Sequence, residues 1–230
     1  MGVRDHYLAP IIYFKGITVE GIKICGVSEK VLEEARARQA RWVNKKELNW
    51  YLADRLPGMA LEVYVAAIHN CFQNWQAVCG LVFKQTTDAA KADFMVRVRR
   101  IDGGSGILAE HELPMGGNQT LNGWFDSSER WVVSGTPGQS IDLIAVGTHE
   151  FGHGIGLSHT NIPQNLLNPI YTPRIRTPQA WDIQEAQNRY GPAIAEPEPP
   201  KEDPSGNNFL IPTEILAKIG GQPYLYVLKK

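Results

Sequence analysis

Eleven consecutive residues, from His149 to His159, constrain this 230-residue chain more than any other segment. They read HEFGHGIGLSH, so that histidines stand at positions 149, 153 and 159, with Glu150 and Gly156 between them. Half of the six histidines of the chain fall in this segment. A buried amphipathic helix with incidental histidines does not require this combination of spacings. We therefore interpret the segment as a metal-binding motif.

Helical geometry accounts for the spacing of the motif. Residues four apart lie on one face of an α-helix, so His149 and His153 can direct both imidazoles at one ion. Gly156 can adopt the left-handed conformation that ends helices, and the resulting turn would bring His159 to the same ion. Three histidines leave a fourth tetrahedral position for solvent, which is typical of a catalytic zinc site. Glu150 would lie beside the ion, in the position of a general base.

Composition excludes several classes of protein. Apolar residues make up 43% of the chain, the net charge is −1 and the isoelectric point is about 6.6. This balance gives no electrostatic reason to expect nucleic acid or an anionic membrane as a partner. No apolar run approaches the roughly 18 residues of a membrane-spanning helix. Residues 1–14 do not resemble a signal peptide, so an incomplete precursor, export by a non-Sec route and a cytoplasmic location all remain open.

Apolar periodicity predicts an α+β domain followed by an extension. Helices are expected at 28–42, 59–78 and 141–154, and a fourth is expected from Thr177 to Gly191. The segments with a strand pattern are 48–52, 81–83, 94–99, 107–109, 123–125 and 131–133. After Pro192 the composition predicts a proline-rich linker over 193–208 and a tail over 209–230, whose role the sequence leaves open.

Four further segments accompany the histidine motif in a fixed order. They are DGGSGILA at 102–109, FDSSERW at 125–131, LLNPIY at 166–171 and WDIQEAQNRYG at 181–191. With the motif, they resemble the catalytic domain of the matrix metalloproteinases, the matrixin branch of the metzincins, over residues 43–192. The resemblance implies a zincin domain with a twisted mixed sheet of about five strands, three main helices and an active-site cleft. Residues 1–42 would form an N-terminal extension similar to a propeptide.

The same resemblance implies a zinc endopeptidase that acts as a monomer. Glu150 would take a proton from a water activated by the metal and pass it to the leaving amine. The alternative is a catalytically silent module that binds zinc and serves as a binding or structural subunit. Retention of Glu150 argues against this alternative, because a scaffold does not need the base.

In the related enzymes, a protein or peptide substrate lies extended along an edge strand and opposite a wall. The residues that match the strand and the wall are Ile107, Leu108 and Ala109, and Pro169, Ile170 and Tyr171. At the base of the pocket behind this wall, Ala145 stands where relatives often carry a large residue. We therefore expect a deep apolar pocket that prefers a bulky hydrophobic residue of the substrate.

Three departures from the family pattern concern the metals. Leu167 stands in place of the methionine under the zinc, a nearly volume-conserving change that we expect to be tolerated. Glu110 and Trp124 occupy positions of two histidines of the family's structural zinc site, so we predict one zinc and no structural second zinc. A calcium site is expected, with ligands that match the family's carboxylates, namely Asp102, Asp126 and Glu129.

The three cysteines and His111 lie outside the motif. Cys25, within the sequence Cys-Gly-Val, resembles the core of the family's latency peptide, whose thiolate closes the zinc site. The alternative is a buried cysteine beside a short strand at 22–24. Cys71 is expected to lie on its helix as a small apolar residue, although Cys71 and Cys79 are close enough to pair. His111 is expected to face solvent.

Overall fold

The computed structural model describes residues 22–194 except 105, 117–118 and 134–139. The tail expected at 209–230, and all but two residues of the linker expected at 193–208, lie outside the described residues, as do residues 1–21 of the N-terminal extension. Among the described residues, no helix combines the length and the apolar character needed to cross a bilayer.

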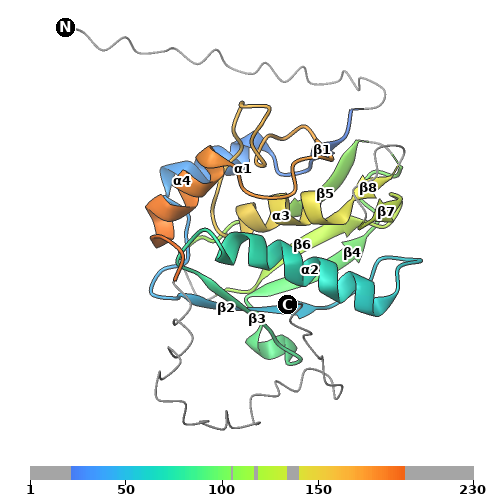
Figure 1. Cartoon of the computed structure of the whole chain (residues 1–230), viewed down its shortest axis with the longest axis horizontal. Coiled ribbons are helices and arrows are strands. Elements are labelled where there is room, and N and C mark those ends of the chain that lie inside the picture. Colours follow the sequence, from blue (N-terminus) through green and yellow to red (C-terminus); the bar gives the residue numbers. More distant parts are fainter. Residues whose placement is uncertain (1–21, 105, 117–118, 134–139, 195–230) are drawn as a thin grey trace, which may run out of the picture. The chain divides into compact units, whose positions relative to one another are not determined.

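The described part of the chain is an α+β fold built on one large mixed sheet (Figure 1). Its six strands lie in the order β1 (Ile24–Cys25), β5 (Ile107–His111), β6 (Leu121–Asp126), β4 (Phe94–Arg99), β2 (Glu47–Leu52) and β3 (Val82–Gln85). Only β5 and β6 pair antiparallel. A second sheet joins β7 (Trp131–Val132) to β8 (Ile141–Asp142). The predicted fold class is confirmed, and the N-terminal segment adds a strand to the expected sheet.

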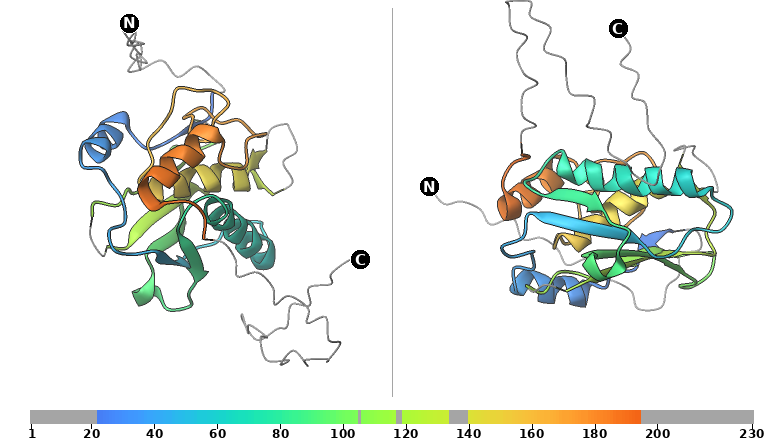
Figure 2. Two further views of the ribbon diagram at one scale, coloured as in Figure 1. Left: turned by 60° about the vertical axis from the view of Figure 1, so that its left-hand side comes forward. Right: turned by 90° about the horizontal axis from the view of Figure 1, so that it is seen from below.

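Four α-helices accompany the sheet in the described residues: α1 (Glu29–Ala37), α2 (Leu61–Gln76), α3 (Leu143–Gly154) and α4 (Ala180–Tyr190). A 3-10 helix, Ala89–Lys91, precedes β4. Helices α2 and α3 lie together against the sheet, as the views in Figures 1 and 2 show. The buried residues of α2 recur at helical spacing and form its core-facing stripe: Tyr64, Ala67, Ile68, Cys71, Phe72 and Trp75. Phe72 stacks on Phe151 of α3 with ring centroids 4.0 Å apart, which fixes the two helices face to face.

Two of the expected helix boundaries were wrong by several residues. Helix α1 ends at Ala37 and not at position 42, because Gln39 has a φ of 50° and the chain turns there. The turn sends Trp42 into the main core, where its indole Nε1 donates to the carbonyl of Gly154. Helix α4 begins at Ala180, because Asp182 accepts a hydrogen bond from the backbone N–H of Gln179 and so caps the helix there.

Helix α3 is defined at both ends by specific residues. Asp142 accepts hydrogen bonds from the N–H groups of Ile144 and Ala145, so the helix begins at Leu143 and not at Ile141, which lies in β8. At the other end Gly156 has a φ of 89°, and a Cβ built there would lie 2.0 Å from the carbonyl oxygen of Ala40. Both the turn and the close backbone approach require glycine, as the motif predicted.

The three cysteines are free thiols, and both Cys71 and Cys79 are buried. Cys71 lies on the core face of α2, where it behaves as a small apolar residue, as expected. Burial raises the pKa of the Cys71 thiol to about 12 and that of Cys79 to about 11. Neither thiol is therefore a nucleophile near neutral pH.

His111 is buried, and the expectation that it faces solvent was wrong. Its ring packs between the rings of Phe94 and Phe151, in a space left by two glycines. A Cβ at Gly123 would lie 2.4 Å from an imidazole carbon of His111, and a Cβ at Gly154 would lie 2.7 Å from another. Its Nδ1 lies 2.6 Å from the carbonyl oxygen of Glu112, and burial lowers its pKa to about 4.

Acid should therefore destabilise the fold through His111. The neutral ring is favoured in the folded state, so its contribution is fully present above the unfolded pKa of about 6.5 and is lost as the pH falls towards 4. The expected loss of unfolding free energy is about 3 kcal/mol over this interval. Urea unfolding of the wild type and of His111→Leu, at pH 7 and pH 4.5, measures it. The three motif histidines are present in both proteins, so equal pH dependences of the two would contradict this role of His111.

Candidate active site

The three motif histidines converge on one point at the floor of a cleft. His149 and His153 lie one turn apart on α3, and their Nε2 atoms are 3.1 Å apart. The turn at Gly156 brings the Nε2 of His159 to 3.2 Å from that of His153. The Sγ of Cys25 lies 3.5 Å from the Nε2 of His153. Among the described residues, these four form the one group of three or more potential metal ligands whose atoms lie within 4.8 Å of one another.

The partners of the ring nitrogens show that this cluster fits a cation. The Nδ1 of His149 lies 2.7 Å from the carbonyl oxygen of Leu166, and that of His153 lies 2.8 Å from the carbonyl oxygen of Leu157. A carbonyl only accepts, so each Nδ1 carries the hydrogen and each Nε2 carries a lone pair. Two lone pairs at 3.1 Å repel unless a cation lies between them. Three nitrogens and a sulfur as donors suit zinc.

Electrostatics reinforce this conclusion. Burial, together with the neighbouring imidazoles, lowers the pKa of His149 to about 3 and that of His153 well below its ordinary value. Both rings are therefore neutral near pH 7 and available as ligands. Burial, and secondarily the nearby Glu150, raises the pKa of the Cys25 thiol well above its ordinary value. A thiolate at this position needs a cation to compensate its charge.

Glu150 lies next to His149 on α3 and is almost completely buried. Neither of its carboxylate oxygens has a hydrogen-bond partner among the described residues. Burial raises the pKa of this carboxyl to about 8. A buried carboxyl without a partner is costly to the fold, and such groups concentrate at sites of proton transfer.

The segment after His159 supports the centre from below. Leu167 is fully buried, and its side chain packs against α3 where Gly152 leaves space for it. The carboxylate of Asp182, on α4, accepts hydrogen bonds from the N–H groups of Leu166 and Leu167. This holds the carbonyl of Leu166 at the Nδ1 of His149. Leucine in place of methionine thus leaves the support under the histidines intact.

The cleft above the centre holds the chain's own residues 23–26. On one side the N–H of Gly26 donates to Ala109 on β5, and that of Ile24 donates to Gly106. On the other side the N–H of Cys25 donates to the carbonyl of Pro169, and the N–H of Tyr171 donates to that of Lys23. Strand β1 therefore bridges the two walls of the cleft, and its direction is parallel to β5.

The structure brings the expected substrate-binding residues together around this cleft. Ile107, Leu108 and Ala109 lie on β5, and the wall of Pro169, Ile170 and Tyr171 faces them across β1. A pocket at the cleft is lined by His149 and Glu150 of the site and by the wall residues Pro169, Ile170 and Tyr171. Its other lining residues include the apolar side chains of Leu108, Ala145, Val146 and Ile175 and the polar side chains of Asn165, Asn168 and Thr172.

The positions expected to have lost a structural zinc site hold a different cluster. The guanidinium of Arg99 pairs with the carboxylate of Glu110. Its Cζ also lies 4.4 Å from the ring centroid of Trp124. A cation, an acid and an aromatic ring thus stack across neighbouring strands at this place.

The three candidate calcium ligands are engaged in hydrogen bonds and an ion pair. The buried carboxylate of Asp126 accepts from the N–H groups of Asp102, Gly103 and Ser128. Asp102 accepts in turn from the N–H of Ile107. Both oxygens of Glu129 lie 2.6 Å from the ammonium of Lys23. These contacts tie Asp102, Gly103 and Lys23 to the end of β6 and the residues that follow it.

A mixed sheet along a cleft, with three histidines of one motif at the floor of the cleft, is the arrangement typical of the zincin class. Comparison with protein families narrows the class, because the matrixin family model matches residues 41–191, more than half of the chain. The chain belongs to the matrixin family, and this membership implies zinc.

Curated relatives agree with this assignment. The chain is 32% identical to karilysin of Tannerella forsythia over 143 residues, 30% to human matrix metalloproteinase-26 over 178 residues and 32% to human matrix metalloproteinase-27 over 170 residues. These alignments cover 58%, 73% and 69% of this chain. They span 29%, 66% and 32% of the relatives' own lengths, so the chain spans at most about two thirds of any of them.

Sequence reasoning missed one residue of the centre. Glu29, at the start of α1, places Oε1 2.9 Å from the Nδ1 of His159. This hydrogen bond lowers the pKa of the Glu29 carboxyl, although burial opposes the shift. The two residues are 130 positions apart, and the only available signal was an acid four residues after Cys25.

Proposed function

We propose that this chain is a zinc-dependent endopeptidase. The observation that carries the proposal is the convergence of three imidazoles on one point, beside a buried carboxyl at the floor of a cleft. Membership of the matrixin family and the names of the relatives support a metallopeptidase. Cleavage of casein or gelatin by the protein freed of its N-terminal segment, abolished by a chelator and restored by zinc, tests it. A zinc-loaded protein that cleaves neither would count against it.

In the proposed reaction His149, His153 and His159 hold the metal, and Glu150 handles the proton. Zinc, when bound, polarises the scissile carbonyl and lowers the pKa of water towards about 7. Glu150 accepts a proton from the attacking water and delivers it to the leaving amine. A carboxyl pKa near 8 suits this double role, because proton exchange in both directions is most efficient near the working pH.

We propose that the substrate is a protein or peptide bound in an extended conformation. The backbone groups that now bond residues 23–26 would pair with substrate instead, by addition of a strand to β5. The carbonyls of Ala109 and Pro169, which now accept from the N–H groups of Gly26 and Cys25, would accept from substrate instead.

The pocket at Ala145 should select a bulky hydrophobic residue just after the scissile bond. Replacing Ala145 with leucine fills the pocket base with three carbons. We expect kcat/KM to fall about 10–200-fold for a peptide with leucine at that position, and to change little for one with alanine. A peptide-library profile of both enzymes measures this. Preference of the parent enzyme for small or charged residues would contradict the proposed pocket.

We further propose that residues 1–42 act as a latency segment through Cys25. Three observations support this: the Sγ of Cys25 lies at the histidine cluster, residues 23–26 bond to both walls of the cleft, and β1 pairs with β5. A thiolate completes a tetrahedral set with the three imidazoles and leaves no position for water. Catalysis would then require displacement or removal of this segment.

We also propose a calcium site at Asp102, Asp126 and Glu129. The site would require Lys23 to release Glu129, so calcium should bind better once the N-terminal segment has gone. At a calcium concentration about 100 times its Kd, the melting temperature of the processed protein should rise by about 5 °C or more. Magnesium and the Asp102→Asn variant are the controls. An equal melting temperature in calcium and in magnesium would contradict the proposed calcium site.

A further inference from the structure

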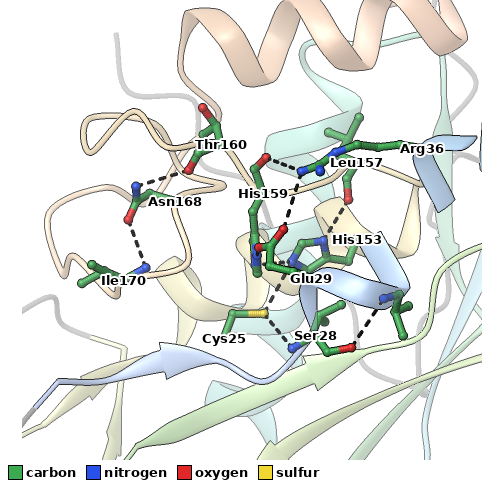
Figure 3. Close-up of polar contacts among 12 residues, drawn as sticks. Cys25, Ser28, Glu29, Arg36, His153, Leu157, His159, Thr160, Asn168 and Ile170 are labelled. Carbon is green, nitrogen blue, oxygen red and sulfur yellow. Dashed lines mark hydrogen bonds and ion pairs between the residues drawn. The ribbon is translucent and has the colours of Figure 1, made fainter. Parts of the chain in front are cut away.

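We infer that Glu29 is a positioning residue of the metal centre, through which the N-terminal segment holds the third histidine as well as closing the site. This inference rests on the proposed zinc site but not on the latency role of Cys25. Figure 3 shows the contacts: the carboxylate of Glu29 points at the ring of His159, and the guanidinium of Arg36 points at its carbonyl.

Each ligand histidine has an acceptor on its Nδ1, but the three acceptors differ in origin. Those of His149 and His153 are carbonyls of the domain that carries the histidines, within 17 residues of each ring. The acceptor of His159 is a side-chain carboxylate from α1, which precedes β2 and the rest of that domain. A charged acceptor fixes the tautomer and orientation of the ring and makes its Nε2 a stronger ligand.

Glu29 is held in place because helix α1 is capped at its start and packed against the domain. The hydroxyl of Ser28 caps the helix by accepting from the N–H of Val31. The helix is anchored by Leu32 and Ala35, both fully buried. They belong to a small core separate from the main one, whose members are Val27, Leu32, Ala35, Ala40 and Leu113.

Arg36, two turns further along α1 than Glu29, also contacts His159. Its Nη2 donates to the carbonyl of His159 at 3.1 Å, and it lies 4.0 Å from the carboxylate of Glu29. His159 is thus held at its ring by Glu29 and at its backbone by Arg36. If the segment that carries α1 is removed, both contacts go, so the processed protein should hold its metal less tightly than the full chain.

The test measures zinc release in a Cys25→Ser background, so that the thiolate makes no contribution. The zinc-loaded parent, and the same protein carrying Glu29→Gln or Glu29→Ala, are mixed with excess chelator, and release is followed with a metal indicator. We expect Glu29→Ala to release zinc about 10–100-fold faster than the parent. Glu29→Gln, whose amide oxygen can still accept from the Nδ1 of His159, should release zinc at a rate between those of the parent and Glu29→Ala. Glu34→Gln, on the exposed side of α1, is the matched control and should release zinc at the parent's rate.

Equal release rates for the parent and both Glu29 variants would overturn the inference. Glu29→Gln keeps the size and polarity of the side chain, so it gives a result even if Glu29→Ala does not fold. A Cys25→Ser parent that binds no zinc would overturn the proposed zinc site and this inference together. A zinc-loaded parent with unaltered release from the variants would overturn this inference alone.

Discussion

Replacing Glu150 with alanine should reduce peptide-bond hydrolysis by about 10²–10⁴-fold, while the protein keeps its zinc. The variant should keep its zinc because Glu150 bonds to none of the ligand nitrogens, whose Nδ1 partners are Leu166, Leu157 and Glu29. Hydrolysis should fall because the variant lacks the general base. The measurement is kcat/KM on a fluorogenic peptide, made on protein freed of its N-terminal segment. Zinc content and melting temperature are determined on the same samples.

Glu150→Gln is the matched control, because the amide keeps the shape of the carboxylate but cannot serve as the base. Both variants should fold and bind zinc, and both should be nearly inactive. A zinc-loaded Glu150→Ala protein with wild-type activity would show that another group moves the proton. A wild-type protein as inactive as the variant would favour the silent zinc-binding module instead.

Replacing Cys25 with serine should raise the activity of the 230-residue chain by about 100-fold or more. The thiol is tethered next to the metal site, so its effective concentration is far above that of a free thiol. Serine is a much weaker zinc ligand and leaves the fourth position open to water. The hydrogen bonds of residues 23–26 to both walls remain, so substrate must still displace the segment.

A thiol-reactive mercurial provides the control for this prediction. It should activate the wild type but not Cys25→Ser, which keeps the buried thiols of Cys71 and Cys79. Equal activity of wild type and variant, with no response of either to the mercurial, would leave Cys25 as an ordinary partly buried cysteine.

The sequence could predict the convergence of the three histidines because its signal is local. His149 and His153 are related by one helical turn, and the position of His159 follows from a turn that only Gly156 allows. Strands β2 to β6 were also predicted in place, whereas β8 lies in a segment predicted as helix. The long core helix was predictable because α2 carries its buried residues at regular helical spacing. The resemblance to a family placed the remaining segments in order.

Contacts between distant segments could not be predicted in the same way. No periodicity indicates that Glu29 reaches His159, or that Arg99 contacts both Glu110 and Trp124. The prediction that His111 faces solvent was wrong because two distant glycines, Gly123 and Gly154, make room for its ring, and no local pattern indicates this. The helix end that was wrong by several residues goes with a tertiary contact: α1 ends early, and the indole of Trp42 then donates to the carbonyl of Gly154.

Zinc K-edge X-ray absorption on the 230-residue chain tests the central claim most directly. The account predicts one zinc per chain, with three nitrogen ligands at about 2.0–2.1 Å and one sulfur at about 2.3 Å. The Cys25→Ser variant should show the same nitrogens with the sulfur replaced by a light atom. A spectrum without three nitrogen ligands, or a stoichiometry of two zinc ions per chain, would contradict it.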